Sequence, residues 1–253
     1  MSSPQFAARR AAFRALHHDG CFTLPNPWDA GSAKRLEKLG FKALASTSAG
    51  AAWALGQDDG GLTRDQVLAH LSMLCAATDL PVNADFEAGF ADEPEGVAES
   101  VRLAIGTGIA GLSIEDRIGR DLYEPALAVE RIRAARGAID ASGEDVILVG
   151  RTEGFLIGRK DLSATIDRLV AYAEAGADCL YAPGVIDVAS VAQIVNAVAP
   201  KPVNVLMAWP GQAVRPLADV GVRRVSVGAA LAGAAWAGFD VAAKMLAEEG
   251  RLP

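Results

Sequence analysis

Cysteine is scarce in this chain, which contains only Cys21, Cys75 and Cys179 among its 253 residues. These three are far apart and odd in number, so a disulfide-stabilised scaffold is not expected. Their spacing also matches no cysteine-based metal site.

Histidine is equally rare and lies in the wrong places for catalysis. His17, His18 and His70 fall in segments with a helical pattern rather than at the ends of the strands predicted below. A histidine general base and a histidine-rich zinc site are therefore not expected.

Aromatic residues and positive charge are also in short supply. Only 6% of the residues are aromatic while 51% are hydrophobic, so the core must be aliphatic and rich in alanine. The 24 basic residues are outnumbered by 31 acidic ones, which gives a net charge of −7. A nucleic-acid partner is therefore not expected. A small anionic substrate would need a local cation or a metal ion to overcome the overall field.

Long apolar segments are missing as well. Residues 1–18 lack the apolar stretch of a secretory signal, and no uncharged apolar run of about 18 residues occurs. These features predict a cytoplasmic protein without a membrane partner.

Short apolar runs alternate with longer amphipathic segments along the whole chain. The runs predict strands at residues 21–26, 42–47, 81–87, 110–116, 146–153, 178–183, 202–207 and 223–228. The amphipathic segments predict helices at residues 29–39, 64–78, 94–106, 125–140, 161–175, 187–198, 211–219 and 229–248, with one more helix at 5–18. Eight alternating pairs at this length favour a closed (β/α)₈ barrel, an α/β fold in one domain over residues 1–253. An open doubly wound sheet is the alternative, but no glycine-rich phosphate loop follows the first strand.

In such a barrel the active site lies at the carboxyl ends of the strands. The polar residues at these predicted ends are Asn26, Asp29, Thr47, Ser48, Asp85, Glu87, Glu115, Asp116, Arg151, Glu153, Tyr181, Asn204 and Ser226. Asp85 and Glu87 are two residues apart and would share one face of a strand, with Glu115 facing them from the next strand. Three carboxylates around one point require a cation. Oxygen ligands favour Mg²⁺, with Mn²⁺ as the alternative.

Two loops at the same end of the predicted barrel carry weaker signals. Residues 58–64 contain Asp58 and Asp59 on a glycine-rich loop, which is either a solvated turn or part of the site. Residues 45–52 form a turn of small residues whose hydroxyl and backbone N–H groups could bind a carboxylate or a phosphate.

Taken in order, several segments resemble the isocitrate lyase/phosphoenolpyruvate mutase superfamily. The matching segments span residues 24 to 228 and read LPNPWDAGSAKRLEKLGFKALASTSAG, ALGQDDG, LPVNADFEAGF, GIAGLSIED, GRTEGF, AYAEAGADCLYAPG, PVNVL and GVRRVSVG. The resemblance implies a (β/α)₈ barrel whose last helix is exchanged with a neighbouring subunit, in a homo-oligomer that is expected to be a tetramer. It also implies Mg²⁺ and a small 2-oxo or 2-hydroxy carboxylate substrate.

The resemblance further implies roles for individual residues. Asp85 would bind the metal directly, while Glu87, Glu115 and Asp59 would hold it mostly through water. The turn of Thr47, Ser48, Ala49 and Gly50 would bind the substrate carboxylate, and Arg151 would contact the oxo acid end. The expected catalytic residues are Arg151, Asp59 and Glu115, and the further expected substrate contacts are Glu153 and Asn204.

The chain departs from the named family activities after the fourth predicted strand. Isocitrate and methylisocitrate lyases carry a Lys-Lys-Cys-Gly-His run there, whereas residues 115–125 read EDRIGRDLYEP, which also lacks the Lys and Asn of the mutase. Decarboxylation of an oxaloacetate-type acid needs no dedicated acid if a metal stabilises the enolate, so this carbon–carbon lyase reaction is favoured. A methylisocitrate or isocitrate type of lyase, an enzyme acting on the P–C bond of phosphonopyruvate, and a non-enzymatic metabolite-binding barrel are the alternatives.

Residues 117–124 are also predicted to form a flexible lid over the site. Arg117 and Arg120 would then meet the second carboxylate of a diacid. In the alternative interpretation they pair with Asp116 and Asp121 on an ordinary surface.

Overall fold

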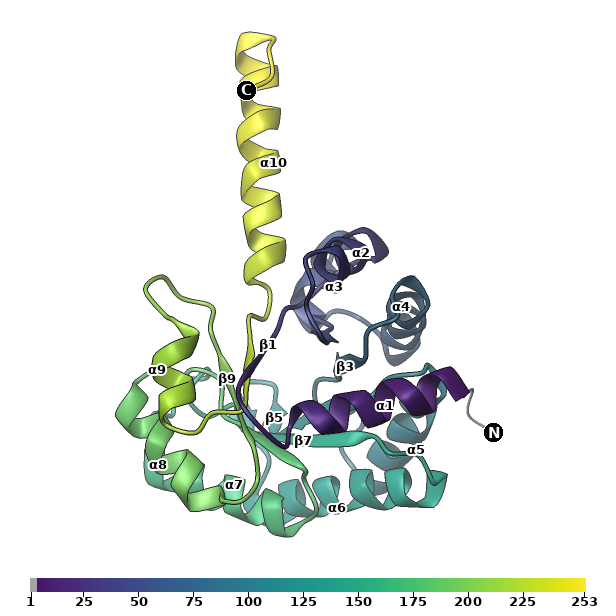
Figure 1. The fold of residues 1–253 in the computed structure, drawn as a ribbon, viewed down its shortest axis with the longest axis vertical. Helices are drawn as coiled ribbons and strands as arrows, with labels where there is room; N and C mark the ends of the chain where they lie inside the picture. Colours follow the sequence, from purple (N-terminus) through teal and green to yellow (C-terminus); the bar gives the residue numbers. More distant parts are fainter. Residues whose placement is uncertain (1–3) are drawn as a thin grey trace.

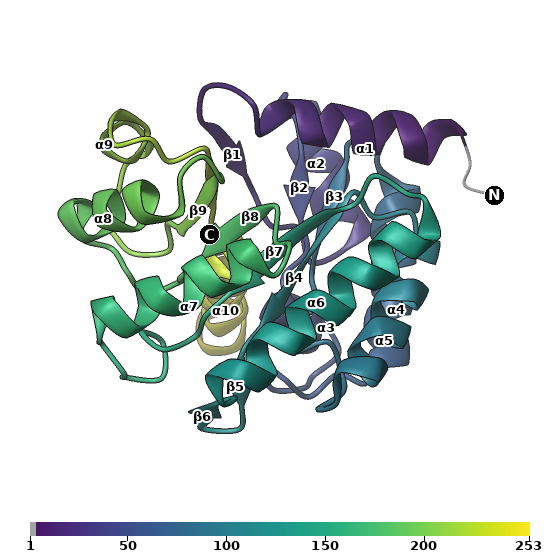
Figure 2. The same cartoon turned by 90° about the horizontal axis from the view of Figure 1, so that it is seen from below.

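Eight parallel strands form a nearly closed barrel in the computed structural model, which describes residues 4–253. They are β1 (Phe22–Leu24), β2 (Leu44–Ala45), β3 (Val82–Asp85), β4 (Gly111–Glu115), β7 (Ile147–Arg151), β8 (Cys179–Tyr181), β9 (Val203–Leu206) and β10 (Arg224–Ser226). Their order is β1-β10-β9-β8-β7-β4-β3-β2. The backbone N–H of Ala45 donates to the carbonyl of Pro25 across 3.1 Å, which joins the two ends of the sheet. The predicted (β/α)₈ barrel is therefore confirmed (Figure 2).

Helices alternate with the barrel strands, and most of them cover the outer face of the barrel. They are α1 (Pro4–Leu16), α2 (Ala30–Lys38), α3 (Ser48–Ala54), α4 (Arg64–Ala77), α5 (Pro94–Gly106), α6 (Pro125–Ser142), α7 (Leu162–Glu174), α8 (Val188–Val198), α9 (Val214–Asp219) and α10 (Ala230–Glu249). The predicted caps are present, because Thr63 accepts from the N–H of Gln66 and Asp161 from that of Ala164. Helix α3 was not predicted: residues 48–54 are helical because Thr47 caps them by accepting from the N–H of Gly50.

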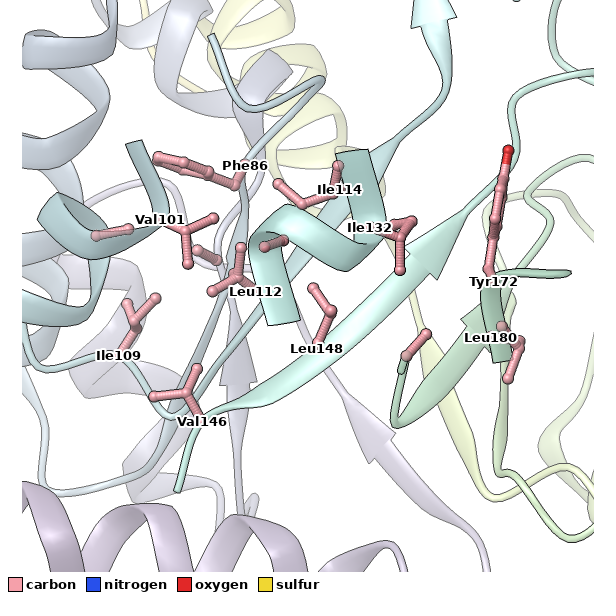
Figure 3. Packing of buried hydrophobic residues seen from close by; sticks show 14 of the residues in the cluster. Phe86, Val101, Ile109, Leu112, Ile114, Ile132, Val146, Leu148, Tyr172 and Leu180 are labelled. Atoms are coloured by element: carbon pink, nitrogen blue, oxygen red, sulfur yellow. The ribbon is translucent and has the colours of Figure 1, made fainter. Parts of the chain in front are cut away.

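Alternation along β4 separates the core from the interior of the barrel. Leu112 and Ile114 belong to the aliphatic core between strands and helices (Figure 3). Ser113 and Glu115 therefore face the other side of the strand, which is the interior and its mouth. The same alternation in the other strands places polar side chains on the inner face of the barrel, including its carboxyl end.

Helix α1 covers the amino end of the barrel. Phe13 is fully buried, and a Cβ atom at Gly111 would lie 2.8 Å from its ring, so only glycine fits there. Arg10 donates to the carbonyl of Ile109 across 2.9 Å, just before β4. The interior is thus closed on this side by α1.

Helix α10 projects away from the barrel (Figure 1). Ala232 is its buried residue, whereas Trp236 and Phe239 are exposed and pack edge-to-face with ring centroids 5.8 Å apart. Of the helices in residues 4–253, α10 is the one that is long and apolar enough to cross a membrane by length and composition alone. It carries Asp240 and Lys244 along its length and Glu248 and Glu249 at its end.

The segment predicted to be a lid forms a small hairpin. Strands β5 (Arg117–Ile118) and β6 (Asp121–Leu122) pair antiparallel, and Gly119 at φ +58° makes the turn. The neighbouring acids pair elsewhere, because Asp121 contacts Arg159 and Asp116 contacts Arg168. The alternative interpretation, in which the loop arginines pair with these two acids, is therefore wrong.

Candidate active site

Arg151, at the end of β7, lies at the centre of three carboxylates. Its Nη1 is 3.0 Å from Asp85, and its Nε is 2.6 Å from Glu153 and 3.3 Å from Glu115. Burial by itself would lower the pKa of Arg151, but Glu115, Glu153 and Asp85 together hold that pKa well above its ordinary value. The guanidinium is therefore a permanent cation that gathers the ends of β3, β4 and β7.

Asp85 is held from two sides at the end of β3. Its Oδ2 accepts from both the backbone N–H and the hydroxyl of Ser48, each at 2.9 Å. The Asp85 N–H in turn donates to the Ser46 hydroxyl at 2.8 Å. The Ser48 hydroxyl also lies 3.1 Å from Asp59, so the loop before α4 reaches the same spot.

Glu87 departs from the predicted strand geometry. Strand β3 ends at Asp85, and Glu87 adopts a left-handed backbone with φ +48°. The expectation that Asp85 and Glu87 share a strand face is therefore wrong, because the chain turns immediately after Asp85. A left-handed non-glycine residue costs on the order of 1 kcal/mol or more, and such strain concentrates at functional sites. The Glu87 carbonyl accepts from the N–H of Glu115 across 3.0 Å, which holds the turn against β4.

The carboxyl groups of this cluster are short of positive charge. Among the described residues, Glu87 Oε1 is buried and has no hydrogen-bond partner. Burial, with the charges of Asp85 and Asp59, raises the pKa of Glu87 to about 7. Burial raises the pKa of Glu115 as well, supported by Glu153 and opposed by Arg151. A divalent cation would relieve this excess of negative charge.

The carboxylates of this site are not arranged as a complete set of metal ligands. Within residues 4–253, no three side chains of Asp, Glu, His or Cys are arranged to hold a metal ion. The carboxylates turn instead toward Arg151 and Ser48. The chemistry of the donors and the unpaired Glu87 oxygen fit a hard cation, and side-chain rotation would be needed to complete its coordination.

Two adjoining cavities lie at this end of the barrel. The outer one, about 330 Å³, is lined by residues that include Asp59, Glu87, Glu115, Arg117, Arg151 and Glu153. The inner one, about 190 Å³, runs into the barrel past Asp85, Asn83, Ser113, Tyr181, Asn204 and Arg224. Ser48, Asp59 and Arg151 line both. Asp58 lies instead beside Trp53 and Trp236 in an outer groove, so Asp59 is the member of the acidic pair that faces the site.

The expected substrate-binding turn is the start of α3. Thr47, Ser48 and Ala49 line the inner cavity, and Gly50 does not. Two amides of the turn already have acceptors, since Ser48 donates to Asp85 and Gly50 to Thr47. A substrate carboxylate at this turn would have to displace Asp85 from the Ser48 amide.

Other polar residues at the strand ends support the walls of the site. Asp29 caps α2 by accepting from the N–H of Ser32 at 2.6 Å. Asn26 donates to the carbonyl of Ser46 at 2.8 Å and accepts from the N–H groups of Val227 and Gly228. Asn26 therefore joins the ends of neighbouring strands, while Asp29 stabilises the start of α2.

Asp116 is buried behind the site and holds Glu153 in place. It accepts from the backbone N–H of Glu153 at 2.9 Å and from the hydroxyl of Tyr172 at 2.6 Å, and it pairs with Arg168 at 3.3 Å. The position of Glu153, and through it that of Arg151, therefore depends on this hidden acid.

Three residues that line the inner cavity were not predicted from sequence: Asn83, Ser113 and Arg224. Each precedes a predicted strand-end residue by two positions, as Asn83 precedes Asp85. These three residues could have been predicted from the alternation of the strands, because residues i and i+2 lie on the same face of a strand.

A (β/α)₈ barrel with acidic side chains and an arginine at the carboxyl ends of its strands defines the chain as a barrel enzyme. Comparison with known proteins shows the family: residues 13–247 match the family profile of phosphoenolpyruvate phosphomutase, and the chain belongs to this family. Members of the superfamily are lyases and mutases that act on small carboxylates. The resemblance inferred from the sequence is thereby confirmed.

Individual relatives support the assignment. A Burkholderia cenocepacia J2315 protein assigned to the lyases or mutases is 48% identical, with a TM-score of 0.95, over 98% of this chain and 91% of the other. The 2-methylisocitrate lyase of Escherichia coli K12 is 32% identical over 197 residues, which cover 74% of this chain and 66% of that enzyme. Oxaloacetate acetylhydrolase, solved with its product oxalate, is 26% identical with a TM-score of 0.90, over 98% of this chain and 89% of the other.

Proposed function

We propose that the protein is a Mg²⁺-dependent carbon–carbon lyase acting on a small 2-oxo or 2-hydroxy carboxylate, with oxaloacetate-type decarboxylation as the favoured reaction. The observation that carries this proposal is the convergence of Asp85, Glu115 and Glu153 on Arg151. The buried Glu87 oxygen beside them, which has no hydrogen-bond partner among the described residues, supports a bound cation. Binding without chemistry would not require so costly a cluster of buried like charges.

The residues that would hold the metal are those inferred from the resemblance. Asp85 would ligate directly, and Glu87, Glu115 and Asp59 would act mostly through water. Mg²⁺, or Mn²⁺ in its place, would supply the positive charge that offsets the electron density building up on the substrate oxygen as the bond breaks.

The remaining residues bind and orient the substrate. The guanidinium of Arg151 would donate to the 2-oxo acid end, and Glu153 keeps that guanidinium in place. The Thr47–Gly50 turn would receive the carboxylate, and Asn204 forms part of the wall. As CO₂ leaves, the bonding electron pair remains on the adjacent carbon, which takes its proton from water. Within residues 4–253, neither cavity is lined by Cys, His or Lys, which supports a reaction that can take its proton from water.

A retro-aldol lyase is the second candidate, and the names of the relatives support it. Such cleavage would need an acid from the loop after β4. Tyr123 is an unsuitable donor there, because its hydroxyl contacts Asp92 at 2.5 Å and its ring lies against Arg131. Arg117 lines the outer cavity, where its guanidinium could stabilise negative charge but could not serve as the acid, because it keeps its proton at neutral pH. The reaction of the mutases at a P–C bond is less well supported, because this chain lacks the Lys and Asn that the mutase carries on the loop after β4.

We further propose that the enzyme is a cytoplasmic homotetramer in which α10 packs on a neighbouring subunit. The exposed apolar side chains of α10 support this, since Phe239 and Val241 are each more than half exposed. An apolar surface of this kind marks an interaction site. The charges of Asp240 and Lys244 make a protein partner a better occupant than lipid.

Turnover of oxaloacetate tests the proposed function. Pyruvate release should be Mg²⁺-dependent, should stop with a chelator, and should exceed the rate of oxaloacetate with Mg²⁺ alone. Parallel reactions with 2-methylisocitrate and phosphonopyruvate would separate the candidates. Equal rates with and without protein for every substrate would rule out the proposal.

A further inference from the structure

A buried arginine lies at the inner end of the inner cavity. Arg224, at the start of β10, is only 2% exposed. Its Nε donates to Asn204 Oδ1 across 3.0 Å and its Nη1 donates to Asn83 Oδ1 across 3.2 Å. Both acceptors are neutral amides, and no carboxylate in residues 4–253 forms an ion pair with this guanidinium.

An uncompensated buried cation is unfavourable and calls for an anion. Burial lowers the pKa of Arg224, in contrast to Arg151, whose three acidic neighbours raise its pKa. Arg131 is a useful comparison, because it is also buried and has no ion pair within residues 4–253. Arg131 donates to backbone carbonyls and stacks on Tyr123 at 4.0 Å, in a void of no measurable volume. Arg224 instead borders an open cavity of about 190 Å³.

The cavity connects Arg224 to the candidate metal site. Asn83, which accepts from Arg224, lies two residues before Asp85 on the same face of β3, which places it about 7 Å deeper in the barrel. Neutral side chains, among them Ser113, Tyr181 and Ser226, line the space between. The volume of about 190 Å³ corresponds to roughly six water molecules, which is room for a short organic acid. Phe13 closes the inner end, with its ring centroid 6.0 Å from the guanidinium carbon of Arg224.

We propose that Arg224 determines substrate specificity by binding a second carboxylate of the substrate inside the barrel. This inference rests on the proposed function for one point, that the 2-oxo or 2-hydroxy acid end lies between Asp85 and Arg151. The substrate is then a short dicarboxylic acid that spans the inner cavity. A monocarboxylic acid would leave the guanidinium without an anion and would bind more weakly.

Arg117 is the competing cation for the second carboxylate. It lines the outer cavity and donates to the carbonyl of Gly119 at 2.9 Å on the exposed hairpin. Water screens a charge in that position, whereas the interior of the barrel screens Arg224 much less. The two arginines therefore make different predictions, and their variants can be compared directly.

Calorimetric titration with malate and lactate at saturating Mg²⁺ tests this assignment on the full-length protein. The two acids share the 2-hydroxy acid end and differ in the second carboxylate. The wild type should bind malate at least about tenfold more tightly than lactate, the value of one charge-assisted hydrogen bond. Arg224→Met should abolish that preference and leave the lactate affinity within about twofold. The matched variant Arg117→Met should keep the preference.

Several outcomes would overturn the inference. One is that the wild type binds malate and lactate with equal affinity. A second is that Arg117→Met loses the preference for malate. A third is that Arg224→Met weakens the binding of both acids equally, which would mark Arg224 as a structural residue. If Arg224→Met does not fold, Arg224→Lys keeps the charge but not both amide contacts, and a preference reduced at least threefold is expected. A malate preference without oxaloacetate turnover would contradict only the proposed reaction. Lactate binding without a malate preference would contradict only the role of Arg224.

Discussion

Ser48 donates both its backbone N–H and its hydroxyl to the same oxygen of Asp85, each across 2.9 Å. The other oxygen of Asp85 accepts from Arg151 at 3.0 Å. The carboxylate is thus oriented by the first turn of α3 on one side and by β7 on the other. Its position requires three segments that are far apart in the sequence.

Replacement of Asp85 tests the centre of the proposed metal site. Asp85→Ala should lower kcat/KM for the Mg²⁺-dependent reaction by at least about 10³-fold, since a metal contributes several kcal/mol to charge stabilisation. The fold should persist because the change removes one of several like charges. Steady-state kinetics and far-UV circular dichroism would measure the two effects. Full activity in this variant would rule out Asp85 as a metal ligand.

The acidic pair after α3 offers a matched comparison. Asp59→Asn should raise the Mg²⁺ concentration for half-maximal activity by about tenfold, because Asp59 lines both cavities and approaches Ser48. Asp58→Asn should have no such effect, since Asp58 lies in the outer groove. Titration of activity with Mg²⁺ in the two variants would measure this difference. Similar Mg²⁺ dependence in both would contradict the proposed role of Asp59 in holding the metal.

The hidden network behind Glu153 should be sensitive to one hydroxyl. Tyr172→Phe removes the 2.6 Å hydrogen bond to Asp116 and should cost about 1–3 kcal/mol of unfolding free energy. It should also lower kcat, because Asp116 holds the backbone of Glu153. Tyr123→Phe is the control: it removes a hydroxyl bonded to Asp92 and should affect stability without lowering kcat. Denaturant titration with steady-state kinetics would separate the two, and an unchanged kcat in Tyr172→Phe would argue against a positioning role.

Stability should fall in mild acid because of His17 on α1. Burial and the nearby charge of Arg224 lower the pKa of His17 from 6.5 to about 3. As the pH falls below about 6.5, His17 is protonated in the unfolded chain but stays neutral in the folded chain. The unfolded state is therefore favoured and stability is lost. From about pH 7 to about pH 5 this loss amounts to about 2 kcal/mol.

His17→Gln should therefore reduce the pH dependence of unfolding by that amount. His18→Gln, at the neighbouring exposed position after α1, should leave the pH dependence as in the wild type, because His17 is retained. Urea denaturation at both pH values and at one protein concentration would measure this. An unaltered pH dependence in His17→Gln would show that other groups cause the acid sensitivity.

The projecting helix α10 should control assembly. Phe239→Glu places a charge at a side chain that is 61% exposed in the single chain and is proposed to be covered in the tetramer. The variant should dissociate to smaller species by light scattering at micromolar concentration. Lys244→Ala on the same helix removes a pair with Glu248 and should leave the tetramer intact. A wild-type protein that is already monomeric under these conditions would contradict the proposal.

The sequence by itself determined the barrel and the location of its site. Alternation of short apolar runs and amphipathic segments is a local property, and the caps at Thr63 and Asp161 are local too. Because the carboxyl ends of parallel strands meet at one end of a barrel, the sequence also predicted that Asp85, Glu115 and Arg151 lie together. These three are in contact through Arg151.

Only the tertiary structure decided the conformation and partners of individual side chains. Glu87 leaves the strand because its turn packs against β4, and residues 48–54 become helical where the pattern suggested a turn. Among the described residues Arg224 has no counter-ion, because its neighbours in the barrel come from β3 and β9 and are amides. Burial and ion pairing depend on residues brought together from distant strands. The free energy of a charge is set by those neighbours, and local sequence patterns carry no information about them.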